Sequence, residues 1–203
     1  MTDEPVPVAA ARVVSPYNPA NILTVVRIVL VPVFLALVVA SSLHGTGPRI
    51  VSCLVFCVAS GTDFLDGWIA RRWSMVTSFG KVADPIADKA LTGTALVLLA
   101  AYGRVWWWVV IVILAREWGV TALRFWVIRY GIIPASRGGK AKTLVQTVAI
   151  GLYVLPLVEL TGGSAVVEPV RVAVMAVAIA LTVITGFDYI LRAARLRSTS
   201  TAA

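Results

Sequence analysis

The sequence predicts an all-α integral membrane protein with six transmembrane helices. Hydrophobic residues make up 59% of the 203 residues and charged residues only 14%, and the mean hydropathy is +0.90. A water-soluble domain of this size does not need so apolar a composition. The apolar residues fall into stretches long enough to cross a bilayer, separated by short polar or glycine-containing breaks. The predicted spans are 21–44, 49–72, 80–101, 106–130, 143–160 and 169–191.

The distribution of basic residues predicts the orientation in the membrane. Lysine and arginine concentrate in the turn 71–81, in the break 129–142 and at the C-terminus. The loops on the opposite side offer only Arg49, Arg104 and Arg171. Because cytoplasmic loops carry the excess of positive charge, both termini are predicted to lie in the cytoplasm.

The regions outside the spans say little about function. Residues 1–20 contain four prolines and no basic start leading into an apolar core, so we expect a juxtamembrane segment and no cleaved signal peptide. Residues 21–197 are predicted to form one six-helix domain without internal repeats or a long linker. The Ser, Thr and Ala residues of 198–203 are predicted to form a disordered tail.

The formal net charge of +8 could suggest a nucleic-acid partner. The basic residues, however, lie within or beside apolar runs and do not cluster on a soluble domain. Anionic lipid headgroups and phosphorylated substrates fit this distribution better, so we expect membrane lipids as partners and no nucleic acid. Arg27, within the first span, is too costly to face lipid and is expected to reach the interface or a polar cavity.

Four of the ten acidic residues are aspartates between positions 63 and 88. Asp63 and Asp66 are three residues apart and Asp84 and Asp88 are four apart, so each pair shares one face of a helix. The polar half of the second span and the polar half of the third lie on the same membrane side. We therefore expect the four carboxylates at similar depth, facing one another.

These carboxylates need compensation, because a charge at membrane depth costs at least about 2.5 to 3.5 kcal/mol. Divalent metal ions are the natural compensators. Oxygen-only ligands favour two Mg²⁺ or Mn²⁺ ions, and the lack of nearby cysteine or histidine disfavours zinc. Two such ions could grip a diphosphate and stabilise a leaving phosphate, which is phosphoryl-transfer chemistry. Gly67 and Gly80 would let the substrate approach the backbone closely, and Arg71 could bind phosphate.

Two other interpretations of the aspartates remain open. The carboxylates could form ion pairs with Arg71, Arg72 and Lys81 in a purely structural membrane protein, although buried ion pairs rarely justify so many acids by stability. They could also line a divalent-cation transporter. Against a transporter, the acidic residues end at one interface and no second acidic cluster continues a path across the membrane.

The aspartate stretch resembles a known family signature. Asp63-x-x-Asp66-Gly67-x-x-Ala70-Arg71, eight residues, and then Gly80-x-x-x-Asp84-x-x-x-Asp88 match every position in the signature of the CDP-alcohol phosphotransferases. The resemblance implies a six-helix membrane enzyme, usually a homodimer, in which an alcohol displaces CMP from a CDP-linked lipid. It implies that Asp88 takes the proton of the acceptor hydroxyl. It also implies metal ligation by Asp63, Asp66, Asp84 and Asp88, and CDP-lipid binding by Gly67, Ala70, Arg71 and Gly80.

The acceptor must be inferred from other residues, because this signature is shared across acceptors. A cationic cluster in the fourth span and the following break suits an acceptor that carries its own phosphate. For some of these residues a topological role is the alternative, and Glu117 is expected to pair with Arg124 or Arg27. Lys89 lies about 100° around the helix from Asp88 and is expected to stay outside the site. The predicted acceptor-phosphate residues are Arg116, Arg124, Arg137, Lys140 and Lys142.

Three segments resemble the corresponding parts of bacterial phosphatidylglycerophosphate synthases, a branch of the same family. They are Asn21-x-Leu23-Thr24-x-x-Arg27, Arg116-Glu117-x-x-x-Thr121-x-x-Arg124 and Gly139-Lys140-x-Lys142-Thr143-x-x-Gln146. The resemblance implies transfer from CDP-diacylglycerol to sn-glycerol 3-phosphate at the cytoplasmic face of a bacterial inner membrane. A phosphatidylinositol phosphate synthase and a cardiolipin synthase of the family are the alternatives.

Overall fold

The computed structural model describes the backbone of residues 19–72, 78–127 and 137–201. The side chains of residues 19–21, 63–64, 66–72, 78–85, 137 and 197–201 lie outside the description. Over the described residues all regular secondary structure is helical, without strands, which confirms the all-α prediction. The helices are α1 (Pro19–Ser41), α2 (Thr46–Arg72), α3 (Ser78–Ala101), α4 (Trp107–Val127), α5 (Arg137–Val154), α6 (Leu157–Leu160) and α7 (Val167–Thr201).

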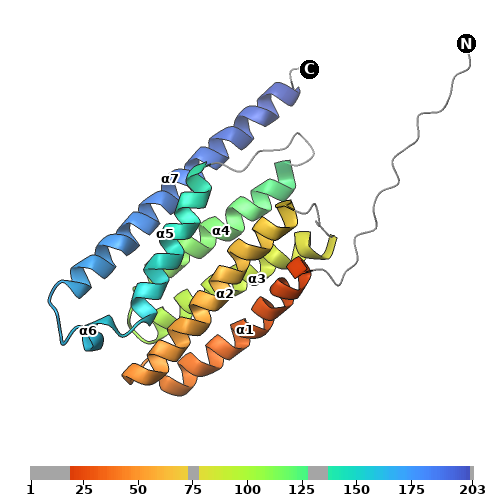
Figure 1. The fold of residues 1–203 in the computed structure, drawn as a ribbon. Helices are drawn as coiled ribbons and strands as arrows, with labels where there is room; N and C mark the ends of the chain where they lie inside the picture. Colours follow the sequence, from red (N-terminus) through yellow and green to blue (C-terminus); the bar gives the residue numbers. More distant parts are fainter. Residues whose placement is uncertain (1–18, 73–77, 128–136, 202–203) are drawn as a thin grey trace, which may run out of the picture.

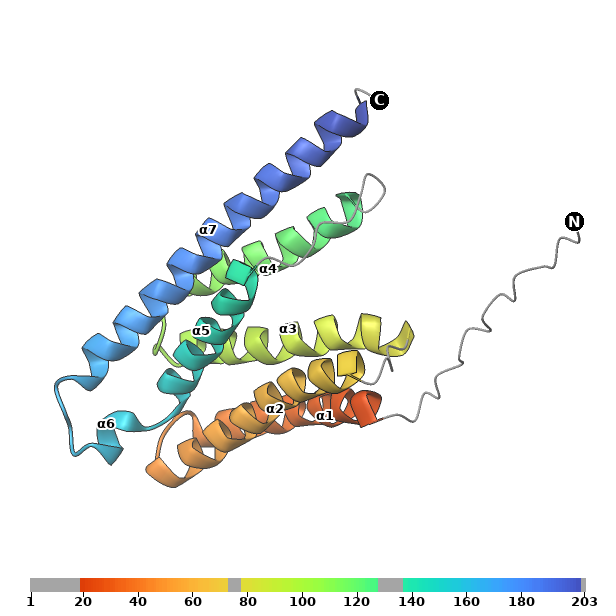
Figure 2. The same ribbon diagram turned by 45° about the horizontal axis from the view of Figure 1, so that its top comes forward.

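The long helices form one bundle (Figures 1 and 2). Helix α1 packs against α2 and α3, α7 packs against α4 and α5, and both α2 and α3 contact α5. The end of α2, the start of α3, the end of α4 and the start of α5 gather at one end of the bundle. The start of α1 and the end of α7 lie at this same end, which we call the polar end because it carries the predicted site residues.

Two of the described helices are long and apolar enough to cross a membrane by length and composition. These stretches are Ile22–Ser41 in α1 and Val167–Leu196 in α7, and a shorter apolar stretch, Thr46–Thr62, lies in α2. Large apolar side chains are nevertheless exposed on all six long helices, as expected for helices that face lipid. Examples are Val29, Leu54, Ile86, Phe125, Leu144 and Ile184.

The interior of the bundle is filled by apolar side chains from several helices. Phe34 of α1 and Phe56 of α2 are fully buried, with their ring centroids 5.7 Å apart. Leu96 of α3, Ile113 of α4 and Ile150 of α5 are also fully buried and belong to the same cluster. These contacts fix the positions of the helices relative to one another, and with them the residues at the polar end.

Both predicted boundaries of the fifth span, 143 and 160, are wrong. Helix α5 runs from Arg137 to Val154, and the separate short helix α6 follows it. The break comes at Pro156, which has no backbone N–H to donate to the preceding turn. The residues from Gly138 to Lys142, predicted to form a polar break, instead form the first turns of α5. The basic residues of this segment therefore stand on a helix.

The end of the chain also differs from the prediction. Helix α7 continues to Thr201 and so enters the segment 198–203, for which a disordered tail was predicted. No glycine or proline interrupts the sequence from Phe187 to Thr201, and alanine, leucine and arginine in this stretch favour a helix. Residues 1–18 of the predicted juxtamembrane segment lie outside the described residues.

Two buried arginines cap the C-terminal end of α5. The last carbonyls of a helix have no partner within the helix. Arg49 of α2 donates to Glu159 Oε1 at 2.7 Å and to three of these carbonyl oxygens. Arg171 of α7 donates to two, one of which it shares with Arg49. The acceptors are the carbonyls of Leu152, Tyr153, Val154 and Leu155. The arginine cap fixes α5 to α2 and α7.

Candidate active site

The predicted metal and CDP-lipid residues lie on two neighbouring helices. Asp63 and Asp66 stand in the second half of α2, and Asp84 and Asp88 stand in the first half of α3, which contacts α2. Both segments belong to the polar end of the bundle (Figures 1 and 2). Except for Asp88, the side chains of this group lie outside the description. They are those of Asp63, Asp66, Gly67, Ala70, Arg71, Gly80 and Asp84.

Asp88 is half-buried, and its backbone carbonyl accepts a hydrogen bond of 2.9 Å from the Thr92 hydroxyl. Its carboxylate charge interacts with the ammonium of Lys142 on α5. The neighbouring Lys89 turns to α4, where its Nζ donates to Thr121 Oγ1 at 2.6 Å and lies 5.6 Å from the centroid of the Trp118 ring. Lys89 thus points to α4, although its charge still acts on Asp88 and Lys142.

Glu117 connects two of the predicted acceptor residues. Its Oε1 accepts hydrogen bonds from Lys142 Nζ of α5 and from Arg116 Nη1, the latter at 3.3 Å. The side chain of Lys142 is only 3% exposed, and those of Arg116 and Glu117 are 17% and 16% exposed. The prediction that Glu117 pairs with Arg124 or Arg27 is wrong, because its partners are Lys142 and Arg116. The early start of α5 explains the difference, because it places Lys142 on a helix within reach of α4.

Arg116 reaches from α4 to α7. Its Nη2 donates to Thr185 Oγ1 at 2.9 Å, while its Nε is buried and has no hydrogen-bond partner among the described residues. A Cβ atom added at Gly186 would lie 3.1 Å from Arg116 Cγ, so the glycine permits the close approach. Thr185 and Gly186 were missed in the sequence, because α7 carries no recognisable motif around them.

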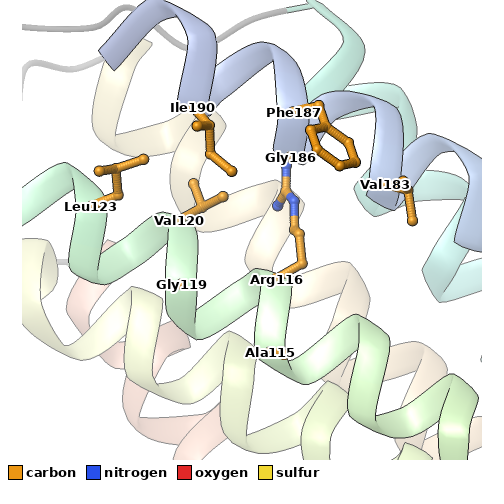
Figure 3. A pocket seen from close by; sticks show the side chains of 9 residues that line it. All are labelled: Ala115, Arg116, Gly119, Val120, Leu123, Val183, Gly186, Phe187 and Ile190. Atoms are coloured by element: carbon orange, nitrogen blue, oxygen red, sulfur yellow. The ribbon is translucent and has the colours of Figure 1, made fainter. Parts of the chain in front are cut away.

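Arg116 lines a groove between α4 and α7. The groove has a volume of about 460 Å³ and is otherwise apolar. Figure 3 shows the Arg116 side chain pointing from α4 towards Gly186 of α7, with Phe187 beside it. The remaining lining residues are Ala115, Gly119, Val120, Leu123, Val183 and Ile190.

The other predicted acceptor residues contribute differently. Arg124 is exposed and lies 5.9 Å from the centroid of the Tyr189 ring. Lys140 is exposed, and the side chain of Arg137 lies outside the description. Gln146, one turn after Lys142 on α5, is buried, and its Oε1 has no hydrogen-bond partner within the described part of the chain. The structure therefore brings together Arg116 and Lys142, but not Lys140.

Among the described side chains around this group, positive charge exceeds negative charge. Four cations act electrostatically on one another or on Asp88, and two carboxylates, Asp88 and Glu117, lie among them. Within this described set, four positive and two negative charges leave a surplus of two positive charges. Like charges repel strongly where water is excluded, so such a group suits an anion that carries more than one charge. The cations are Lys89, Arg116, Arg124 and Lys142.

The structure is a helical bundle in which two neighbouring helices that carry the signature aspartates lie beside a cationic cluster. Residues 17–184 match the model of the CDP-alcohol phosphatidyltransferase family, which covers most of the chain. The chain belongs to this family, and with it to a family of membrane enzymes.

Several relatives are similar over most of the chain. A protein of Mycobacterium tuberculosis named probable phosphatidylglycerophosphate synthase is 53% identical over 178 residues, which are 88% of this chain and 82% of the relative. A CDP-diacylglycerol–glycerol-3-phosphate 3-phosphatidyltransferase of Rickettsia felis is 37% identical over 85% of this chain and 93% of its own length. A Salmonella typhimurium protein of the same name is 39% identical over 66% of this chain and 75% of its own length.

Proposed function

We propose that this chain transfers the phosphatidyl group of CDP-diacylglycerol to sn-glycerol 3-phosphate, giving phosphatidylglycerophosphate and CMP. The names of the relatives and the intact family signature support the two substrates. The observation that supports glycerol 3-phosphate as the acceptor is that Glu117 pairs with both Lys142 and Arg116. The charge of Lys142 also interacts with that of Asp88. A phosphate-binding group beside the proposed base is what a phosphorylated alcohol requires.

Arg116 and Lys142 would bind the acceptor phosphate. The surplus of positive charge is balanced when a phosphate dianion enters, and both side chains are held on helices before the acceptor arrives. Arg124, Arg137 and Lys140 would add attraction for the anionic acceptor from the same end of the bundle. The buried oxygen of Gln146, which has no hydrogen-bond partner among the described residues, would accept a hydrogen bond from an acceptor hydroxyl.

Asp88 would act as the general base. Its carboxylate takes the proton of the glycerol 1-hydroxyl as that oxygen attacks the phosphorus that bears diacylglycerol. The new bond between oxygen and phosphorus forms in line with the bond to CMP, which breaks and leaves CMP with the bonding electrons. Binding of the acceptor phosphate by Arg116 and Lys142 fixes the distance and direction of this attack.

The donor set at the polar end fits hard divalent cations. The signature supplies four carboxylates on the packed helices α2 and α3, whereas His44 and Cys53 lie near the opposite end of α2. Asp63, Asp66, Asp84 and Asp88 would hold two Mg²⁺ or Mn²⁺ ions. When bound, these ions neutralise the diphosphate and stabilise the charge that develops on the leaving group. Gly67, Ala70, Arg71 and Gly80 would flank the CDP group.

The polar end would face the cytoplasm of a bacterium from the inner membrane. In this arrangement α1 to α5 and α7 are the six spans, and both termini are cytoplasmic. The positive-inside distribution of basic residues supports this orientation, and the exposed apolar side chains on each long helix support contact with lipid. We expect a homodimer, as the family resemblance implies, with the acyl chains of the donor between helices.

The proposed reaction is tested by CMP release from the purified protein in detergent with CDP-diacylglycerol and Mg²⁺ or Mn²⁺. Glycerol 3-phosphate, inositol phosphate and phosphatidylglycerol are each supplied as the sole acceptor. We expect release only with glycerol 3-phosphate. Release with another acceptor would overturn the acceptor assignment, and metal flux into proteoliposomes without any CMP release would favour a transporter.

Replacement of Gly186 by alanine should weaken acceptor binding. The added Cβ would lie 3.1 Å from Arg116 Cγ and would displace the arginine by a few tenths of an ångström. We expect the KM for glycerol 3-phosphate to rise about threefold to tenfold, with little change in the KM for CDP-diacylglycerol. Gly119→Ala in the same groove is the matched control, because no atom lies within 4 Å of its added Cβ. Equal KM values for the two variants would contradict the positioning of Arg116 by Gly186.

A further inference from the structure

We propose that Glu117 is a positioning residue for the acceptor phosphate. Its carboxylate holds the ammonium of Lys142 and the guanidinium of Arg116 where the phosphate binds. This inference rests on the proposed function, since it gives a role in acceptor binding to a residue that does not itself bind the acceptor.

The contacts show how Glu117 brings the two cations together. One oxygen, Oε1, accepts from both Lys142 Nζ and Arg116 Nη1. The cations come from different helices, α5 and α4, and Arg116 is held from its other side by Thr185 of α7. Glu117 therefore links Lys142 on α5 to Arg116, which itself joins α4 to α7.

Lys142 needs such an anchor, because a lysine side chain has a long flexible stem and no fixed geometry of its own. Its ammonium is almost fully buried, and a buried charge without a partner is costly. Among the described residues, the carboxylates whose charge acts on Lys142 by contact or electrostatic interaction are Glu117 and Asp88. Without Glu117, the ammonium would lose the carboxylate that it contacts.

Loss of that contact would let the ammonium leave the position in which it binds phosphate beside Arg116. Glu117 thus keeps the two cations that recognise the acceptor together at one place.

Glu117→Gln tests the inference with little change in shape. The amide removes the negative charge but keeps an oxygen in place of Oε1. We expect the KM for glycerol 3-phosphate to rise about tenfold or more, with a smaller fall in kcat and an almost unchanged KM for CDP-diacylglycerol. Glu117→Asp, which retains the charge, should restore most of the acceptor affinity. Glu168→Gln is the control for loss of a carboxylate, because Glu168 is exposed and contacts Arg171 near the end of α5 that lies away from the site.

A double-mutant cycle shows whether Glu117 acts through Lys142. We expect Lys142→Gln alone to raise the acceptor KM, and Glu117→Gln to add little in that background. Additive effects, or an unchanged acceptor KM in Glu117→Gln, would overturn the positioning role. Thermal unfolding of each purified variant identifies a folding defect. If Glu117→Gln alone does not fold, the double variant, which buries no unpaired ammonium, still tests the role, and a further tenfold rise of its acceptor KM over that of Lys142→Gln would overturn it.

The wild-type protein measured alongside separates the two proposals. If it releases CMP with glycerol 3-phosphate while the variants behave as wild type, only the role of Glu117 fails. If it releases no CMP with glycerol 3-phosphate, the proposed function fails, and the role of Glu117 in acceptor binding fails with it.

Discussion

Asp88→Asn is expected to lower CMP release by roughly three orders of magnitude, within the range that a general base contributes. The amide cannot take the proton of the acceptor hydroxyl, and it is a poorer ligand for a divalent cation. Binding of CDP-diacylglycerol should largely remain, because the other predicted ligands are intact. The measurement is kcat with glycerol 3-phosphate, together with direct binding of the CDP-lipid to the purified variant.

Asp188→Asn provides the matched control for this substitution. Asp188 lies on α7, is partly exposed, and forms an ion pair with Arg192 at 2.9 Å. Exposed ion pairs of this kind contribute little to stability, so this variant should retain nearly full activity. Full activity in Asp88→Asn would remove Asp88 as the base.

Removal of divalent cations is expected to reduce CMP release to background. Four carboxylates on α2 and α3 would then repel one another, and the diphosphate would lack the charge that neutralises it. Addition of excess Mg²⁺ or Mn²⁺ after treatment with a chelator should restore activity. The measurement is CMP release by the same protein before treatment, after treatment and after readdition.

The chelation experiment also needs the metal content of the protein. Activity that persists when bound Mg²⁺ and Mn²⁺ fall well below one ion per chain would contradict a metal-dependent reaction. Loss of activity that neither ion restores, with the protein still folded by thermal unfolding, would point to a different cation.

The two helices that carry the aspartates could be predicted because their information is local, whereas the arrangement of the four carboxylates stays a prediction. The spacing of Asp63, Asp66, Asp84 and Asp88 defines faces of two helices, and α2 and α3 occur where that spacing requires them. Arg27 was also predictable from the cost of a charge in lipid. It is fully buried, and its Nε lies 3.5 Å from Thr62 Oγ1 of α2.

The acceptor side was less predictable because it depends on contacts between distant segments. The pairing of Glu117 with Lys142 requires α5 to begin before Lys142 and to approach α4, and neither condition is visible in the spacing of charges. The close approach of Arg116 to Gly186 joins residues 70 positions apart, and an isolated glycine in an apolar helix carries no motif. The break at Pro156 was visible in the sequence, but the apolar residues beyond it obscured the end of the helix.

The arginine cap has a consequence for how the protein matches its bilayer. Helix α5 has 18 residues and is therefore about 27 Å long, shorter than the roughly 30 Å of a typical hydrocarbon core. Arg49 and Arg171 satisfy its last carbonyls inside the protein, so this end does not have to reach the headgroups. In the proposed six-span arrangement, hydrophobic mismatch would be concentrated on one side of the molecule, and a thinner bilayer would accommodate α5 at lower cost than a thicker one.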